Sequence, residues 1–391
     1  MPLNVAAERE QQMLLSIIFG VALILVVLWD AFETIVLPRR VTRRIRLARL
    51  FYRYTWLSYS RIARSISSSR TLETFLSFYG PLSLIFLLCV WATGLIFGFA
   101  ILQWGSGSGI NSPEGFVGFT KDLYLSGTTF FTLGLGDVTP RTAVARVLTA
   151  VEAGLGFGFL ALVIGYLPLL NQSFSRREVN ISLLDARAGS PPTAAEMLRR
   201  HSRDGGLELL HQSLYEWERW SAELLESHLS YPVLAYFRSQ HDNQSWLACL
   251  TTILDTSALV IVGIEGSDLP QAGLTFAMAR HAVVDLSQVF HCPPIRPKSD
   301  RLSKAALSEL RASLAENGVM LRHGREADQK LTELRLMYEP YAYSLSNYLS
   351  MPLPQWTSGR NRADNWQTSA WERKSVHKGT GLPGDIDDEH F

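Results

Sequence analysis

Three long apolar segments dominate the N-terminal half of the sequence. The first runs from Met13 to Leu37 with only Asp30 and Glu33 interrupting it, the second covers Leu76–Trp104 without a charge, and the third covers Thr142–Leu170. A helix needs about 20 predominantly apolar residues to cross the hydrocarbon core of a bilayer. The pattern therefore predicts three transmembrane helices.

A shorter apolar segment, Phe116–Phe131, lies between the second and third of these. It leads into a stretch rich in Thr and Gly, SGTTFFTLGLGDVTP at 126–140. The segment is too short to cross a bilayer and return, so it fits a helix that enters half-way and leaves on the same side. Irregular backbone at membrane depth is tolerated only where protein or a water-filled path surrounds it. We expect a re-entrant pore helix and a loop that lines a pore.

The segment TLGLGD at 132–137 has the composition that an ion-coordinating backbone requires. A cation that sheds water needs replacement oxygens at regular, close spacing. Consecutive carbonyls supply them if alternate residues adopt left-handed dihedrals, which glycine does without steric cost. Gly134 and Gly136 meet this spacing. The carbonyls of residues 132–135 are then expected to face one axis, and because one chain supplies one wall, four chains are needed to encircle an ion.

The longer pattern Thr129-x-x-Thr132-x-Gly134-x-Gly136-Asp137 resembles the selectivity filter of the potassium channel family, whose usual form is TVGYGD. The resemblance covers about 76–170. It implies a homotetramer around a central potassium path, with 116–131 as pore helix and 142–170 as pore-lining inner helix. The filter residues that it implies are Thr132, Leu133, Gly134, Leu135 and Gly136, with Thr129 as support and Asp137 at the outer mouth. FETIVLPRRVTRR and EAGLGFGFLALVIGYL are also similar to bacterial pore proteins of this class that carry one extra N-terminal span.

Leu135 departs from the family pattern, which usually has an aromatic residue at this position. A Tyr there can hydrogen-bond to the pore helix and brace the filter, whereas Leu can only pack. The carbonyl pattern is unaffected, and the second pore loops of two-pore-domain potassium channels are similar in having GLG. Potassium conduction is therefore the expected function, and nonselective monovalent cation conduction is the alternative.

Two further residues of the third apolar segment are candidates for a role in conduction. Gly156 falls where the family's inner-helix hinge glycine falls, so it is a candidate gating hinge, with close helix packing as the alternative. For Gly154 and Gly158 we expect packing. Glu152 is an acid in a membrane helix, and such residues usually face protein or water. We expect it either to draw cations toward the cavity or to pair behind the filter.

Basic residues are unevenly distributed around the predicted spans. The segment 38–75 contains ten Arg and a single acid, whereas 105–141 contains only Lys121 and Arg141 as basic residues. Basic loops stay preferentially on the cytoplasmic side of a membrane. We therefore expect a multi-pass protein of the cell membrane, with the N-terminus outside and the residues after 170 in the cytoplasm.

Part of this Arg-rich segment has helical spacing. The residues that fall on one helical stripe are Arg39, Arg43, Arg46, Arg49 and Arg53. A voltage-sensing helix looks similar, but it needs counter-charged helices around it, and one span precedes this stretch. The segment Arg39–Arg64 is instead expected to lie as a juxtamembrane helix against anionic lipid headgroups. Asp30 and Glu33 are expected to pair with Arg39 or Arg40.

The C-terminal half reads as a helical domain. The predicted helices are Thr193–Arg203, Gly206–His228, Asn243–Gly263, Leu269–Phe290, Ser303–Asn317 and Arg325–Leu349. Thr193 and Glu196 have the spacing of a capping box. The stretch 246–264 is apolar enough for a fourth span, but Asp255 at its middle favours the buried helix of a bundle.

The sequence thus predicts an all-α membrane protein. Its parts are an N-terminal transmembrane helix at 1–38, an Arg-rich linker at 39–75, a pore module at 76–170, a helical cytoplasmic domain at 171–350 and a disordered tail at 351–391. Hydrophobic residues make up 47% of the 391 positions and charged residues 19%, which suits a membrane part joined to a water-soluble part.

Composition and motifs narrow the function classes. The net charge of +1 argues neither for nor against a nucleic-acid partner, and none is expected. The three cysteines show neither paired nor metal-ligand spacing. GxGxxG, a phosphate loop and a nucleophile elbow are missing. We expect no enzyme, no cofactor and no metal apart from permeating potassium. A transporter subunit, and a membrane-anchored enzyme or signalling protein working through 180–350, are the alternatives.

Overall fold

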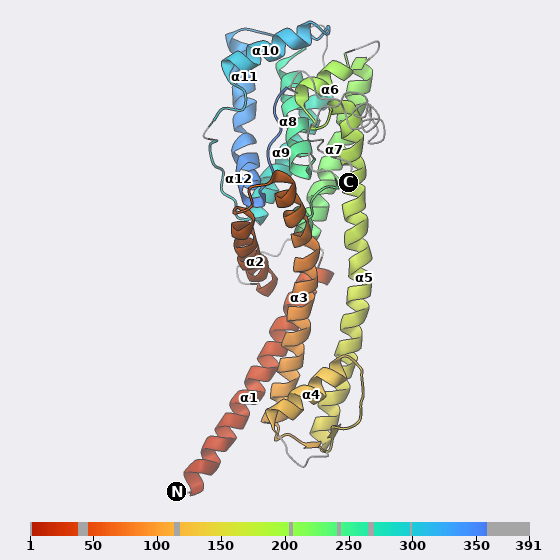
Figure 1. The fold of residues 1–391 in the computed structure, drawn as a ribbon, viewed down its shortest axis with the longest axis vertical. Helices are drawn as coiled ribbons and strands as arrows, with labels where there is room; N and C mark the ends of the chain where they lie inside the picture. The colour runs from red at the N-terminus through yellow and green to blue at the C-terminus, as the bar shows by residue number, and fades with distance from the viewer. Residues whose placement is uncertain are drawn as a thin grey trace, which may run out of the picture. The chain divides into compact units, whose positions relative to one another are not determined.

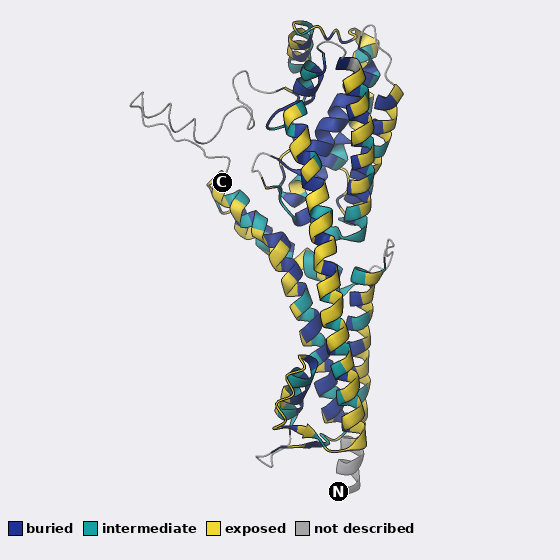
Figure 2. Cartoon of the chain, turned by 90° about the vertical axis from the view of Figure 1, so that its right-hand side faces the viewer, coloured by how far each residue is buried: buried dark blue, intermediate teal, exposed yellow. Residues whose placement is uncertain are grey.

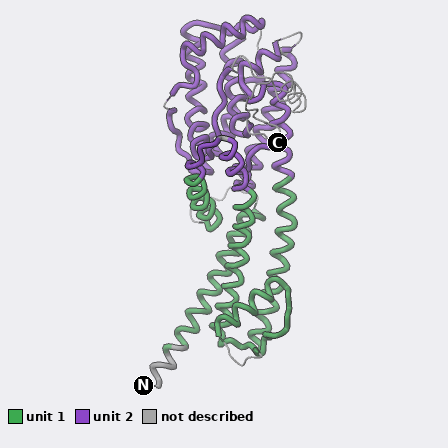
Figure 3. Tube along the Cα trace, viewed as in Figure 1, with its two compact units in different colours: residues 1–62, 81–171 green, residues 63–80, 172–391 purple. Residues whose placement is uncertain are grey.

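The computed structural model describes residues 2–37, 46–112, 118–202, 206–240, 244–264, 270–297 and 299–357. The chain divides into two compact units (Figure 3). Unit 1 comprises Met1–Ile62 and Pro81–Asn171, and unit 2 comprises Ala63–Gly80 and Gln172–Phe391. Each unit is built almost wholly from helices.

The first eight elements make up the membrane part and its extensions (Figure 1). They are α1 (Pro2–Ala31), the π-helical turn η1 (Phe32–Val36), α2 (Leu47–Ala63), α3 (Ser69–Gly105), β1 (Ile110–Asn111), α4 (Phe119–Phe130), β2 (Thr139–Pro140) and α5 (Ala143–Ala188).

Three helices are long and apolar enough to cross a membrane, at Glu10–Val36, Arg70–Gly105 and Ala143–Ala188. The prediction of three transmembrane helices, with a short helix and loop between the second and third, is therefore confirmed. These long helices carry many exposed side chains (yellow in Figure 2), as expected for helices that lipid or other subunits cover.

The third of these helices extends well beyond its predicted end. α5 continues past residue 170 to Ala188, with Pro168 inside it. Residues 171–188 are amphipathic, and their apolar side, which includes Ile181 and Leu184, is buried in unit 2. Hydropathy marks only the part of a helix that lies in lipid, whereas packing against other helices supports the remainder.

Asp30 joins α1, α2 and α3 in the core of unit 1. Its carboxylate accepts the backbone N–H of Ala48 at 3.0 Å, which satisfies a free donor in the first turn of α2, and the indole N–H of Trp91 at 2.9 Å. Glu33 accepts a hydrogen bond from the indole N–H of Trp29. Its Oε2 atom lies 3.4 Å from Nε of Arg46. The predicted partners Arg39 and Arg40 lie outside the described residues, so that pairing stays a prediction.

Unit 2 is a helical bundle. Its remaining elements are α6 (Ala194–Arg200), α7 (Gly206–Ser230), the 3-10 turn η2 (Pro232–Tyr236), α8 (Trp246–Val262), α9 (Pro270–Val289), α10 (Lys304–Ala315), α11 (Arg325–Leu336) and α12 (Glu339–Leu349). α8 packs against α6, α7, α9, α11 and α12, and all of its residues but Ile261 are buried. The stretch 246–264 is therefore the buried helix of a bundle.

Two local predictions for unit 2 meet different outcomes. Thr193 accepts the N–H of Glu196 at 3.3 Å, as the N-cap of α6. The reciprocal bond of a capping box is not formed, because the Glu196 carboxylate bonds Arg199 and Arg200 and the N–H of Thr193 donates to the carbonyl of Ala188. The single helix predicted at Arg325–Leu349 is wrong, because the structure has two helices that separate at Met337–Tyr338. Pro340 lies in the first turn of α12, where its missing N–H costs nothing, whereas inside one continuous helix it would remove a hydrogen bond.

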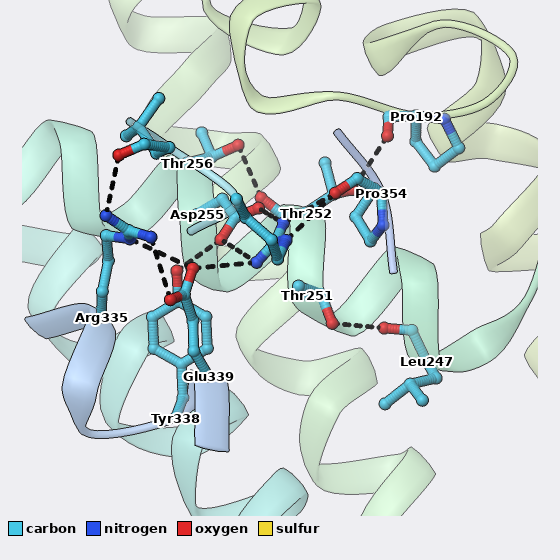
Figure 4. Close-up of polar contacts among 12 residues, drawn as sticks. Pro192, Leu247, Thr251, Thr252, Asp255, Thr256, Arg335, Tyr338, Glu339 and Pro354 are labelled. Atoms are coloured by element: carbon cyan, nitrogen blue, oxygen red, sulfur yellow. Dashed lines mark hydrogen bonds and ion pairs between the residues drawn. The ribbon is translucent and has the colours of Figure 1, made fainter. Parts of the chain in front are cut away.

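A buried charge network fixes the position of α8 (Figure 4). Asp255 in its middle accepts from the guanidinium of Arg301 at 2.6 Å and from the hydroxyl of Tyr338. Arg301 also bonds Glu339 at 3.1 Å. Burial, together with the negative charges of Asp255 and Glu339, raises the pKa of Tyr338. The acid that argued against a membrane span is thus compensated inside the bundle.

The first residues of the predicted tail also belong to the bundle. Trp356 is buried between the guanidinium groups of Arg301 and Arg335, whose central carbons lie 5.7 and 5.6 Å from its ring. Its carbonyl accepts the N–H of Ala195 at 3.1 Å. Residues 351–357 are therefore ordered, unlike the prediction for 351–391; the part from 358 onward lies outside the described residues.

Arg177 anchors the end of α5 within unit 2. It is buried, donates to the carbonyls of Leu234 and Phe237 at 2.8 and 2.9 Å, and has its Nη1 atom 3.4 Å from Nε2 of His228. Burial, with the adjacent positive charge of Arg177, lowers the pKa of His228 from 6.5 to about 3. His228 is therefore neutral at physiological pH.

Candidate functional site

The C-terminal end of α4 holds the start of the candidate filter. The N–H of Phe131 donates to the carbonyl of Gly127 at 3.2 Å, that of Thr132 to Thr129 at 2.9 Å, and that of Leu133 to Thr128 at 2.8 Å. The last carbonyls of an α-helix have no N–H partner within the helix. Here the N–H groups at the start of the loop bond these carbonyls. Thr129 thus contributes through its backbone, and the first filter residues are fixed to the pore helix.

Every second residue of the candidate filter has left-handed backbone dihedral angles. Thr132, Gly134 and Gly136 have φ of 56°, 55° and 79°. The two glycines adopt the left-handed region that their spacing predicts, and Thr132 adds a third position in register with them. Thr132 takes this conformation as the residue that ends α4, since the N–H groups of Leu133 and Thr132 bond the carbonyls of Thr128 and Thr129 in a Schellman motif. Alternation of this kind turns successive carbonyls toward the same side of the chain.

The candidate filter segment is exposed within a single chain. Residues 131–137 are all exposed, and the side chains of Leu133 and Leu135 are 62% and 64% accessible. The next residue, Val138, is buried with Ile110 and Leu125. The segment is thus anchored at both ends and uncovered between them.

The anchor after the filter is a small antiparallel ladder. Ile110 pairs with Pro140, and Asn111 with Thr139, in strands β1 and β2. The N–H groups of Arg141 and Thr142 then donate to the carbonyl of Gly109. These bonds tie the exit of the filter to the loop that follows α3.

Asp137 is braced by a residue that the sequence did not single out. The side chain of Tyr124, on α4, lies close enough to the Asp137 carboxylate to interact with it electrostatically. Leu135 has no polar group that could bond the helix, so this contact is a second link between the candidate filter and α4. A polar aromatic residue near the middle of a short apolar helix was the available signal.

Gly156 has the closest packing of the inner-helix glycines. A Cβ atom there would lie 2.1 Å from the carbonyl oxygen of Phe130, whereas no atom of the described chain lies within 4 Å of that position at Gly154 or Gly158. Within one chain the close approach is found at Gly156, and packing at Gly154 and Gly158 stays a prediction. α5 is continuously helical through Gly156. The role of Gly156 as a gating hinge stays a prediction.

Glu152 is buried, with 1% of its surface exposed, and its carboxyl contacts the hydroxyl of Ser126 on α4. Of the two expected roles, this placement corresponds to pairing behind the filter. Ser126 was not predicted, and it lies on the face of α4 that packs against α5. The pore helix is therefore held by polar as well as apolar contacts.

A short helix that ends in a glycine-rich loop, between two membrane-crossing helices, defines a pore-loop membrane protein. Residues 84–168 match the model of a family described as ion channel. This part of the chain is a pore-loop ion channel module, and the match covers α4, the filter segment and most of the spans on either side. No curated protein and no solved structure gives a match.

Proposed function

We propose that four copies of this chain form a channel that conducts potassium ions down their gradient through Thr132–Gly136. The observation that carries the proposal is the left-handed alternation at 132, 134 and 136, in a segment that is anchored at both ends and exposed between them. Carbonyls presented in this way replace the hydration shell of a permeating cation. Potassium is the only ion that the proposal requires, and no covalent chemistry or cofactor is involved.

The tetramer follows from the same geometry. One chain offers one wall of carbonyls, and only 11% of the most apolar window of α5 is buried within its own chain. Copies of the chain around one axis would complete the ring of oxygens and cover the exposed face of α5. The channel is proposed to lie in the cell membrane with its N-terminus outside and unit 2 in the cytoplasm, following the Arg-rich segment.

α2 is proposed to lie against anionic lipid headgroups. It exposes the apolar side chains of Leu50, Tyr54 and Leu57 beside Arg53 and Arg61. Such a helix places apolar side chains at the acyl boundary and its Arg groups among phosphates, with about 1 kcal/mol per charge. The Arg53→Gln/Arg61→Gln variant should lose the dependence of flux on anionic lipid in reconstituted vesicles, and an unchanged dependence contradicts the proposal.

A nonselective monovalent cation channel is the second candidate. The observation that favours it is Leu135, which is exposed and has no polar group with which to brace the filter. Potassium selectivity then rests on the backbone and on the contact between Tyr124 and Asp137.

Flux into liposomes tests the proposal. Purified full-length protein should pass potassium along its gradient without an energy source, and barium should block the flux. Chemical cross-linking of the same preparation should yield species up to four chains. Absence of flux in every lipid composition, together with a folded protein, contradicts the channel proposal.

A further inference from the structure

α4 and α5 meet along a seam of two contacts. Glu152 of α5 contacts Ser126 of α4, and Gly156 of α5 packs on the carbonyl of Phe130. Both pairs are separated by four residues on their own helix, so the two contacts lie one turn apart on facing sides. Phe130 is the last residue of α4, two residues before the filter begins at Thr132. The seam therefore lies behind the filter.

The hydroxyl of Ser126 has two oxygen neighbours but only one proton. Its Oγ atom lies 2.7 Å from the backbone carbonyl oxygen of Ile96 on α3 and also contacts Oε1 of Glu152. Two oxygen atoms at hydrogen-bonding distance need a proton between them. The carbonyl of Ile96 carries none and Ser126 supplies one, so the second must come from the carboxyl group of Glu152.

We propose that Glu152 is a positioning residue for the filter and acts as a neutral carboxylic acid. Its O–H donates to Ser126 Oγ, and the Ser126 O–H donates to the Ile96 carbonyl, so one chain of hydrogen bonds ties α5, α4 and α3 together. This inference rests on the proposed channel function. It assigns Glu152 a role in holding the pore helix, distinct from attraction of cations in the cavity.

The surroundings of Glu152 agree with a neutral group. Ser126 and Glu152 are both shielded from water, and Glu152 Oε2 has no hydrogen-bond partner among the described residues. An ionised carboxylate there would be a buried charge without compensation. Two polar side chains on neighbouring elements make hydrogen bonds elsewhere, while Asp122 Oδ1 and Gln103 Oε1 have no partner among the described residues. Asp122 of α4 bonds Ser108 at 2.6 Å, and Gln103 of α3 bonds the carbonyl of Ala145 at 3.3 Å.

Infrared difference spectroscopy of the full-length protein in liposomes tests the protonation state directly. At neutral pH the wild type should show the C=O stretch of a buried carboxylic acid. The Glu152→Gln variant should lack it, and Ser126→Ala should shift it because the acceptor of the acid proton is lost. Asp122→Asn is the matched control and should leave the Glu152 band in place. If Glu152→Gln removes no carboxylic acid band, the proposal is overturned.

Potassium flux tests the positioning role. Gln donates an N–H to Ser126 in place of the acid, so Glu152→Gln should retain flux within about twofold of wild type, whereas Glu152→Val, which leaves Ser126 without its donor, should lose about tenfold. Raising the pH should reduce flux in the wild type and leave Glu152→Gln unaffected. Two results would overturn the positioning role of Glu152. One is an equal loss of potassium flux in Glu152→Gln and Glu152→Val. The other is an identical pH dependence of flux in the wild type and Glu152→Gln. A wild type with the band and no flux instead contradicts the channel function.

Discussion

Replacement of Gly156 by Ala is expected to separate the inner helix from the pore helix. The added methyl group would lie 2.1 Å from the carbonyl oxygen of Phe130 and 2.9 Å from its carbonyl carbon. Both atoms belong to the backbone, so no side-chain rotation can relieve the contact. Either α5 moves away from α4 or the end of α4 shifts, and the candidate filter begins two residues later, at Thr132.

The expected change in the free energy of unfolding for Gly156→Ala is the sum of two opposing effects. Ala in a helix interior is favoured over Gly by about 1 kcal/mol. Overpacking a close contact costs about 1–3 kcal/mol. Gly156→Ala should therefore be neutral to destabilising by up to about 2 kcal/mol, the difference between these ranges. Gly154→Ala and Gly158→Ala meet no atom of the described chain within 4 Å and should gain the helix preference. We predict a difference of about 1–3 kcal/mol between Gly156→Ala and its controls.

Thermal unfolding of the purified full-length variants in detergent measures this difference, and potassium flux in liposomes measures its effect on the pore. A packing role predicts that Gly156→Ala unfolds earlier than Gly154→Ala and has reduced flux. A hinge role predicts equal stability and altered opening alone. If Gly156→Ala is as stable as Gly154→Ala, the packing argument is refuted.

Three further predictions follow from particular contacts. Tyr124→Phe keeps the ring but removes the hydroxyl that interacts with Asp137, so currents should decay faster or discriminate less between potassium and sodium; unchanged currents count against bracing. Arg301→Met leaves Asp255 buried without its countercharge, which should destabilise unit 2 by about 3–5 kcal/mol in chemical unfolding, and adding Asp255→Asn should restore much of this. The pKa of His228 is lowered from 6.5 to about 3. Between these two pH values the unfolded chain therefore binds a proton that the folded chain does not. Stability should therefore fall with falling pH, by about 1.4 kcal/mol per unit from this group, and His228→Gln should reduce that slope; an identical slope contradicts the burial argument.

Hydropathy and glycine spacing were sufficient to predict the membrane part of the fold. Long uncharged runs can be satisfied only by spanning helices, and the pair Gly134 and Gly136 implied the left-handed backbone that the structure has. These features are local in the sequence. They do not depend on which distant residues come together.

Contacts between helices distant in sequence were beyond the reach of the same reasoning. The partner of Glu152 is 26 residues away on α4, and nothing in the spacing identifies Ser126. Asp30 bonds the first turn of α2 and Trp91, because a buried carboxylate is satisfied by N–H donors that packing brings to it. Trp356 was assigned to a tail because its neighbours are polar, yet its ring fills a site between two guanidinium groups.

Reversal potentials of the purified channel in planar bilayers, with potassium on one side and sodium on the other, test the central claim most directly. If the carbonyls of Thr132–Gly136 replace the water of potassium, the reversal potential should lie far toward the potassium equilibrium potential. Gly136→Ala, which forces a side chain onto a φ of 79°, should abolish that current. A wild-type current that reverses at zero, or one that survives Gly136→Ala with the same ion preference, would contradict the claim.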